Sequence, residues 1–451
     1  MKKLIDTLKN IWAIDELKSK ILVTLALVLT YRIGAQITLP GINPLAIEAA
    51  QKAGGSNGLL GIFDMFAGGA FSQASILALG IMPYISASIF MQLMTILVPQ
   101  LQKIQKEGES GRNKINQWTR YLTVIVTAFQ AGAYVAYLNS PGYAEALIPA
   151  YKPYFWFSTV ITLTAGTLFV MWLGEKIQDK GLGNGTSIII MVGILARLPQ
   201  SIILEFGSKS QKGGGGLLIF LIEIAILVTI IMGLIVLVQG VRKIPVTYAK
   251  QVIGGAQVGG ARQFLPVKVN SAGVMPIIFA QAIMTIPMMV YQGVTQQQDA
   301  GWLTKTLGDP YGVSYNLLLV ILIVVFTYFY TAIMINPSKI ADDLKKSGGF
   351  VPGVRPGEET AEHIDQVVSR ITFPGSLFLA AIAILPSIAK LAGVNDSFAM
   401  FFGGTSILIM VGVVLDTLQQ VETYQLNRNM DSLMEGTRVR GRRGANEFSG
   451  M

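Results

Sequence analysis

The chain alternates between long apolar stretches and shorter polar connections. A transmembrane helix needs about 20 mainly apolar residues, and ten stretches meet this requirement. They cover residues 20–39, 74–98, 118–138, 154–174, 186–204, 217–240, 272–291, 314–335, 371–390 and 400–420. The pattern therefore predicts an all-α polytopic membrane protein with ten transmembrane helices. Because residues 1–20 are polar, we expect the first apolar stretch to be a helix and not a signal peptide.

Composition supports this class and excludes several kinds of chemistry. Hydrophobic residues make up 52% of the chain and charged residues 14%, against about 25% charged in soluble domains. The chain has no cysteine and one histidine, His363, in a charged segment where we expect it to be solvated. No Gly-Lys dipeptide occurs, so the P-loop pattern is absent. We expect no enzyme activity, no catalytic residue, no cofactor and no metal site.

The positions of the basic residues predict the orientation in the membrane. Of the 35 lysines and arginines, 27 lie in the termini and the even-numbered loops, six in the odd-numbered loops, and two, Arg32 and Arg197, within spans. Cytoplasmic loops carry the excess of basic residues. Both termini are therefore predicted to be cytoplasmic.

Ten spans divide into two groups of five. Residues 1–205 would form an N-terminal half, 206–420 a C-terminal half, and 421–451 a cytoplasmic tail. An odd number of spans in each half means that the halves enter the membrane from opposite sides, as in an inverted repeat. Such folds place their working site near the midplane, between the halves.

Two segments do not resemble plain membrane anchors. Residues 58–72 are apolar but too short to cross, and Gly68-Gly69 should separate them from the next helix. They could be a re-entrant or interfacial loop, or a short movable helix that fills a cavity. In the next span Ile81, Ile85 and Ile89 share one face, which by spacing alone indicates ordinary packing or lipid contact. Nearby polar residues favour a helix–helix seam; they are Ser86, Ser88 and Gln92.

Four ionisable residues lie within the predicted spans, and we expect structural roles for them. Glu223 and Asp416 are close to span ends and could reach the interface, and Arg32 and Arg197 have room to snorkel. Two cytoplasmic loops are long. Loop 241–270 has five basic residues and no acid, which indicates either attraction to anionic lipid or nucleic-acid phosphates or simple positive-inside bias. Loop 336–370 mixes charges and resembles a protein-docking surface.

Several strings, in order along nearly the whole chain, resemble the SecY protein-conducting channel family. They are Tyr31-Arg-Ile-Gly34, Gly68-Gly-Ala70, Ala78-Leu-Gly-Ile-Met-Pro-Tyr-Ile-Ser-Ala-Ser-Ile89, Lys106-Glu-Gly-Glu-Ser-Gly-Arg112, Gly183-Asn-Gly185, Leu265-Pro-Val-Lys-Val-Asn270, Asn336-Pro337, Leu344-Lys-Lys-Ser-Gly348, Phe350-Val-Pro-Gly-Val-Arg-Pro-Gly-Glu358 and Phe402-Gly-Gly-Thr-Ser406.

The resemblance implies an hourglass pore between the two halves. A ring of aliphatic side chains would narrow the pore at the midplane: Ile81, Ile85, Ile190, Ile278 and Ile409. A short plug helix would close it outside: Leu59, Leu60, Gly61, Ile62, Phe63, Asp64, Met65, Phe66, Ala67, Gly68, Gly69, Ala70, Phe71 and Ser72. Thr186 stands where relatives often have another aliphatic ring residue.

The resemblance also implies a lateral gate and docking surfaces. The gate would lie between the second and seventh spans, with the third and eighth beside them, and its polar members would be Ser86, Gln92, Gln130 and Thr285. Docking of a motor or ribosome would use Arg355, with Arg262, Lys250 and Lys268; the loop tip Gly254–Gly260 lacks the paired arginines of some relatives. The implied partners are the small membrane subunits SecE and SecG, the SecA ATPase motor, the ribosome through its rRNA and proteins, signal peptides and nascent chains, SecDF, YidC and membrane lipids.

Three classes of function remain to be compared. The resemblance implies a passive channel that translocates unfolded secretory polypeptides across the cytoplasmic (inner) membrane and releases transmembrane segments into lipid. An ion-coupled secondary transporter with an inverted repeat is the alternative, and it would place charged pairs at the midplane, where this chain offers isoleucines. An intramembrane hydrolase lacks a plausible base or metal centre.

Overall fold

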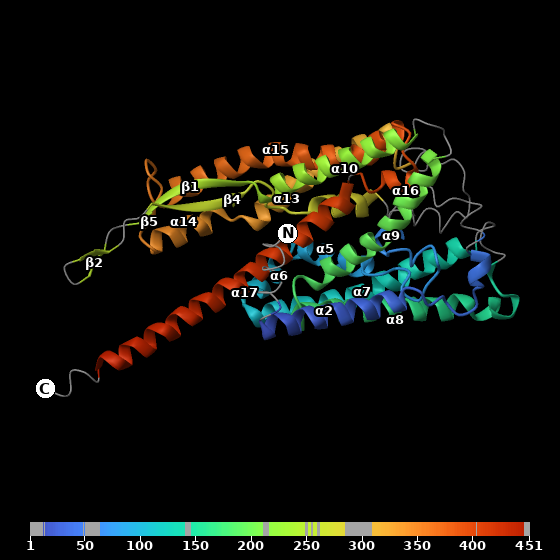
Figure 1. The fold of residues 1–451 in the computed structure, drawn as a ribbon, viewed down its shortest axis with the longest axis horizontal. Coiled ribbons are helices and arrows are strands. Elements are labelled where there is room, and N and C mark those ends of the chain that lie inside the picture. The colour runs from blue at the N-terminus through green and yellow to red at the C-terminus, as the bar shows by residue number, and fades with distance from the viewer. Residues whose placement is uncertain are drawn as a thin grey trace.

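A computed structural model describes residues 12, 14–47, 49, 64–139, 146–210, 216–248, 251–253, 256–258, 262–284, 309–402 and 404–445. The protein is mainly helical (Figure 1). Its helices are α2 (Asp15–Gly34), α5 (Met82–Leu97), α6 (Pro99–Lys106), α7 (Glu109–Leu138), α8 (Lys152–Lys180), α9 (Gly185–Ser210), α10 (Gly216–Gln239), Met275–Met284, α13 (Val313–Met334), α14 (Pro337–Lys346), α15 (Glu358–Leu391), α16 (Asp396–Ala399) and α17 (Gly404–Ala445), with a short 3₁₀ helix η2 at Pro149–Tyr151.

Each of the ten predicted spans contains one of these helices, so the predicted fold class is confirmed. Within the described residues, seven helices are long and apolar enough to cross a membrane, or eight if α5 and α6, bent by 101°, form one span. The predicted ends were less accurate. Residues 74–81 form turns before α5, which starts with Pro83 in its first turn, a position where the missing N–H costs nothing. Helices α15 and α17 extend beyond their predicted spans into charged sequence.

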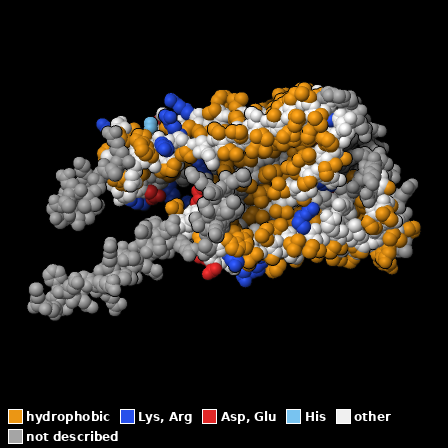
Figure 2. All heavy atoms as spheres, in the orientation of Figure 1, with side chains coloured by type: hydrophobic (Ala, Val, Ile, Leu, Met, Phe, Trp, Pro, Cys, Tyr) orange, Lys and Arg blue, Asp and Glu red, His pale blue; other side chains and the backbone are white. Residues whose placement is uncertain are grey.

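The helices form two groups (Figure 1). Helices α2, α7 and α8 lie on one side of the molecule, and α10, α13 and α15 on the other. Helix α9 packs on α8 of the first group and on α10 of the second, and therefore connects the groups. Orange apolar side chains cover the helical body, while many of the visible lysines and arginines gather toward the end that carries β1 and α14 (Figure 2). The boundary at residues 205 and 206 stays a prediction.

A small β-structure extends from one end of the bundle. Strand β1 (Val241–Tyr248) pairs antiparallel with β4 (Arg262–Lys268) and with β5 (Gly349–Phe350), in the order β4-β1-β5. Strands β2 (Gln251–Ile253) and β3 (Ala256–Val258) form a separate hairpin. These strands were not predicted. The signal was the alternation along β1, in which Ile244 and Val246 are buried, between exposed neighbours, against Leu344 and Ile364.

Candidate pore constriction and plug

The five isoleucines assigned to the constriction come together in one apolar cluster. Ile81 and Ile85 lie at the start of α5, Ile190 on α9, Ile278 on the helix Met275–Met284, and Ile409 on α17. Four of them are at most 9% exposed, and Ile85 is partly buried against the same cluster. We call these five residues the pore ring. The structure brings the whole predicted set together from four separate segments.

The Gly183-Asn-Gly185 motif fixes the start of α9 and thereby the place of Ile190. The Asn184 side chain accepts a hydrogen bond from the Thr186 amide at 3.2 Å, as in a helix N-cap. A Cβ atom on Gly185 would lie 1.9 Å from the Gly174 carbonyl oxygen, so glycine is needed where α9 crosses α8. The Thr186 hydroxyl donates to Asn184 at 2.7 Å, which directs it toward this cap.

The described part of the predicted plug, residues 64–72, is mostly buried and is shared between two apolar clusters. It makes a single helical turn followed by irregular turns. Met65 and Phe66 belong to the same apolar cluster as the pore ring. On its other side the Phe71 ring contacts Tyr134 of α7 at a centroid distance of 4.6 Å, and the Tyr134 hydroxyl donates to the Phe71 carbonyl at 2.6 Å. Residues 59–63 lie outside the described residues.

Both intramembrane arginines point to the plug, which differs from the expected snorkelling. Arg197 of α9 forms an ion pair with Asp64, whose side chain is 3% exposed. The Asp64 carboxylate also accepts the Ser72 amide at 2.7 Å. Arg32 of α2 donates to the Gly68 carbonyl at 3.2 Å. Spacing gave no indication of these contacts, because the partners are far apart in the sequence.

The predicted gate residues lie on packed helices but differ in their surroundings. Gln130 is buried on α7, and α5 packs on α7. Gln92 on α5 is exposed, and the Ser86 hydroxyl donates to the Met82 carbonyl of its own helix at 3.1 Å. Thr285 lies outside the described residues. The gate therefore stays a prediction.

The predicted docking residues include two that the structure places at the surface. The Arg355 side chain is 87% exposed and lies 3.7 Å from Glu359. Lys268 is exposed at the end of β4. Lys250 and the side chain of Arg262 lie outside the described residues.

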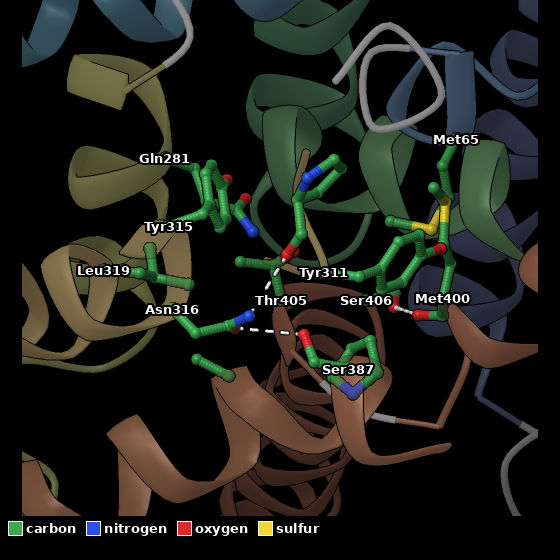
Figure 3. Close-up of a pocket in the computed structure, with 13 residues that line it drawn as sticks. Met65, Gln281, Tyr311, Tyr315, Asn316, Leu319, Ser387, Met400, Thr405 and Ser406 are labelled. Carbon is green, nitrogen blue, oxygen red and sulfur yellow. Dashed lines mark hydrogen bonds between the residues drawn. The ribbon is translucent and has the colours of Figure 1, made fainter. Parts of the chain in front are cut away.

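A small cavity lies beside the plug, between Met65 and the helices α13, α15 and α17 (Figure 3). Its volume is about 50 Å³, which is room for a few water molecules. Asn316 and Ser387 line it and are joined by a hydrogen bond of 3.0 Å. The Tyr315 hydroxyl has no hydrogen-bond partner among the described residues. These polar groups in apolar spans were the sequence signal for the cavity, and sequence analysis missed it.

Tyr311 covers this cavity from the loop before α13. Burial, followed by the negative charges of Asp396 and Asp309, raises the pKa of Tyr311. The phenol therefore stays protonated in the physiological range. The Lys390 ammonium of α15 lies 4.0 Å from the centroid of the Tyr311 ring and 3.1 Å from Asp396 of α16. These contacts connect Tyr311 to both helices.

A second group of charges that sequence analysis missed lies where α9, α10 and the connection after α15 meet. The Lys209 ammonium lies 2.8 Å from Glu223 and 3.4 Å from Glu205, and it donates to the Gly393 carbonyl at 3.1 Å. The Asn395 amide donates to Glu205 at 3.0 Å. We call Glu205, Lys209 and Glu223 the buried triad. The expectation that Glu223 reaches the interface was wrong, because its side chain is 8% exposed and paired with Lys209.

Within the described residues, no group of three or more histidine, cysteine, aspartate or glutamate side chains could hold a metal ion. The observed features instead define a class. The protein is a polytopic helical membrane protein in which isoleucines from four segments meet in one apolar cluster, together with two residues of a short buried segment.

The chain belongs to the SecY family. The SecY family model matches residues 75–418. The protein translocase subunit SecY of Streptomyces scabiei is 42% identical over 93% of this chain and 97% of the relative, and that of Aquifex aeolicus is 40% identical over 94% and 98%. The family assignment confirms the resemblance drawn from the ordered motifs.

Solved structures share the fold. One, described as "The structure of a protein conducting channel", has a TM-score of 0.63 at 17% identity and covers 90% of this chain and 92% of the other. A second, described as "Sec61 in the Canine ribosome-channel complex from the endoplasmic reticulum", has a TM-score of 0.60 at 16% identity, with 90% and 92% covered.

Proposed function

We propose that this chain is the channel-forming subunit of a protein translocon. It would conduct unfolded secretory polypeptides across the cytoplasmic membrane without consuming energy itself. The observation that carries the proposal is the meeting of the pore ring with Met65 and Phe66 of the plug in one apolar cluster. The relatives that match nearly the whole chain carry the name protein translocase subunit SecY.

The pore ring suits this task because of its chemistry. An aliphatic constriction dewets and so blocks ions. Isoleucine side chains make no directional bonds, so the ring accepts any extended polypeptide and selects no sequence. When no polypeptide is present, the plug fills the space beside the ring and completes the barrier.

Transmembrane segments would leave the channel sideways, between α5 and the helix Met275–Met284. A seam with polar members is held less tightly than an apolar one, so an apolar signal helix that binds the open state better shifts the population toward it. Gln130, buried on α7, is the gate member whose surroundings fit this role best. Ser86, Gln92 and Thr285 are the other proposed members.

The orientation and partners follow from charge. The positive-inside bias supports cytoplasmic termini, so the sheet of β1, β4 and β5 would project into the cytoplasm. Arg355 and Lys268, both exposed, would dock the SecA motor or the ribosome, and Arg262 and Lys250 are the other proposed docking residues. Two solved neighbours were described in complexes with ribosomes, which supports ribosome docking.

SecE, SecG, SecDF and YidC would be further membrane partners. The alternative of an ion-coupled transporter finds no support among the relatives.

Crosslinking to a stalled polypeptide tests the proposal directly. The chain has no native cysteine, so single cysteines replace each pore-ring residue, and a translocating chain carries one cysteine. All five ring positions should crosslink to it. Val236 on α10, whose side chain is 72% exposed, gives the matched control that should not crosslink. Crosslinking equal to that of Val236→Cys at every ring position would refute the channel assignment.

A further inference from the structure

The plug carries a buried charge that the channel function does not itself require. Asp64 begins the described part of the plug, and its side chain is 3% exposed. A carboxylate in such a place costs several kcal/mol unless it is paired. Its partner Arg197 is 29% exposed and belongs to α9, a scaffold helix that also carries Ile190 of the pore ring. The ion pair therefore connects the movable segment to the fixed wall.

The backbone of the plug is shaped to make this contact. Gly68 and Gly69 have φ angles of 65° and 95°, a region that favours glycine. A Cβ atom on Gly69 would lie 3.1 Å from the Arg197 guanidinium, and one on Gly68 would lie 2.9 Å from that of Arg32. The two glycines thus let the turn approach both arginines closely. Because Arg32 bonds the Gly68 carbonyl, it holds the same turn without requiring a charge on the plug.

Opening the channel would break this pair. The plug cannot leave the pore ring while Asp64 stays bound to Arg197, since the two residues lie on opposite sides of the surface that must separate. The ion pair therefore stabilises the closed state and not the open state. This shifts the equilibrium between closed and open channel toward the closed state. It does so in addition to the apolar contacts of Met65 and Phe66.

We propose that the Asp64–Arg197 ion pair is a latch that holds the plug closed and so sets how readily the channel opens to a signal sequence. The inference rests on the proposed function. Removing the latch raises the population with a displaced plug about tenfold, a value reduced from that of a fully buried pair because Arg197 is partly exposed. Weak signal sequences, which supply less binding energy for opening, gain most from its loss.

The latch is tested by measuring plug displacement in the chain purified with its associated subunits and placed in liposomes. Ala70 in the plug is 1% exposed, and Ala380 on α15 is 3% exposed in a different apolar cluster that includes none of the described plug residues. A single cysteine at either position reacts with a membrane-impermeant maleimide only when it becomes exposed. The labelling rate then reports the fraction of molecules in which that cysteine is exposed.

We expect Asp64→Asn and Arg197→Gln each to speed labelling of Ala70→Cys about tenfold and to leave Ala380→Cys unchanged. Asparagine keeps the oxygen that accepts the Ser72 amide, so the change removes only the charge. The double variant should label no faster than either single variant, because both remove the same interaction. Glu175→Gln, which removes the partly exposed ion pair with Arg120, is the matched control and should label at the parental rate, because Arg120 lies fourteen residues along α7 from the plug contact Tyr134.

Parental labelling of Ala70→Cys in both single variants would overturn the latch. So would equal acceleration at Ala380→Cys, since that indicates general loosening of the fold. A translocation assay on the parent separates the two proposals. Active translocation with parental labelling rejects the latch and leaves the channel, whereas a parent that translocates no secretory protein rejects the channel whatever the labelling shows.

Discussion

Replacing Lys209 by methionine should destabilise the protein strongly. The lysine side chain is 6% exposed and lies between two carboxylates, Glu223 at 2.8 Å and Glu205 at 3.4 Å, whose side chains are 8% and 0% exposed. Methionine has a similar length and keeps the apolar packing of the stem. The change therefore isolates the loss of the ammonium group, which leaves two buried carboxylates facing each other.

The structure sets the expected magnitude. Removing one partner of a buried ion pair costs about 3–5 kcal/mol, because the remaining charge is buried without compensation. Both glutamates lose their cation here, and the Gly393 carbonyl loses a donor, so Lys209→Met belongs at the upper end of that range. Glu223→Gln should cost less, about 1–3 kcal/mol, because Lys209 keeps Glu205 as its partner.

The free energy of unfolding can be followed by tryptophan fluorescence during titration with sodium dodecyl sulfate in mixed micelles. Lys390→Met is the matched control: it breaks the partly exposed pair with Asp396 and should cost about 1 kcal/mol or less. Adding Glu205→Gln and Glu223→Gln to Lys209→Met should recover most of the loss, since no buried charge then remains. A Lys209→Met protein within about 0.5 kcal/mol of the parent would refute the reasoning that the triad is charged and mutually compensated.

Three further outcomes are expected. Gly166→Ala would place a Cβ atom 2.2 Å from the Ile76 carbonyl oxygen and should cost more than about 2 kcal/mol in the same titration, whereas Gly207→Ala, with no atom within 4 Å, should gain about 0.5–1 kcal/mol. Deleting residues 59–72 should leave a folded protein with transient ion leak, and planar-bilayer conductance identical to the parent's would contradict the plug assignment. Arg355→Glu should impair ATP-driven translocation into vesicles by weakening docking of an acidic partner, and unchanged motor affinity would contradict the docking role.

The apolar architecture was predictable because hydropathy is a local property of the sequence. Each of the ten predicted stretches contains a helix, since a run of about 20 apolar residues has few other stable solutions in a membrane. The pore ring was not predictable in this way. Spacing alone indicated ordinary packing for Ile81, Ile85 and Ile89, and the assignment of Ile190, Ile278 and Ile409 came from the resemblance of the neighbouring motifs.

The small sheet was missed for a different reason. The stretch from Val241 to Tyr248 carries alternating buried positions, but basic residues interrupt it and Pro245 lies in its middle. Its main pairing partner, β4, lies in the same loop, but Ile244 and Val246 are buried by residues that are distant in the sequence, on α14 and α15, and β5 adds a further strand. A window that contains only loop 241–270 cannot contain that information.

The charged residues show why single positions mislead in a membrane protein. Arg32, Arg197 and Glu223 were each interpreted without their neighbours. Considered alone, each charged side chain could reach water at the membrane interface. Asp416 is exposed near the end of its predicted span, and its place at the interface stays a prediction. The other three are held by groups that no local pattern links to them: a plug carbonyl, a plug carboxylate and a lysine at the end of α9. Because a buried charge persists only where the fold supplies its counterpart, a charge within an apolar span is best interpreted as one half of a contact. In this protein two such contacts lie on the predicted plug, where the Asp64–Arg197 pair is the proposed latch, and one lies at the junction of α9 and α10, where we expect it to stabilise the scaffold.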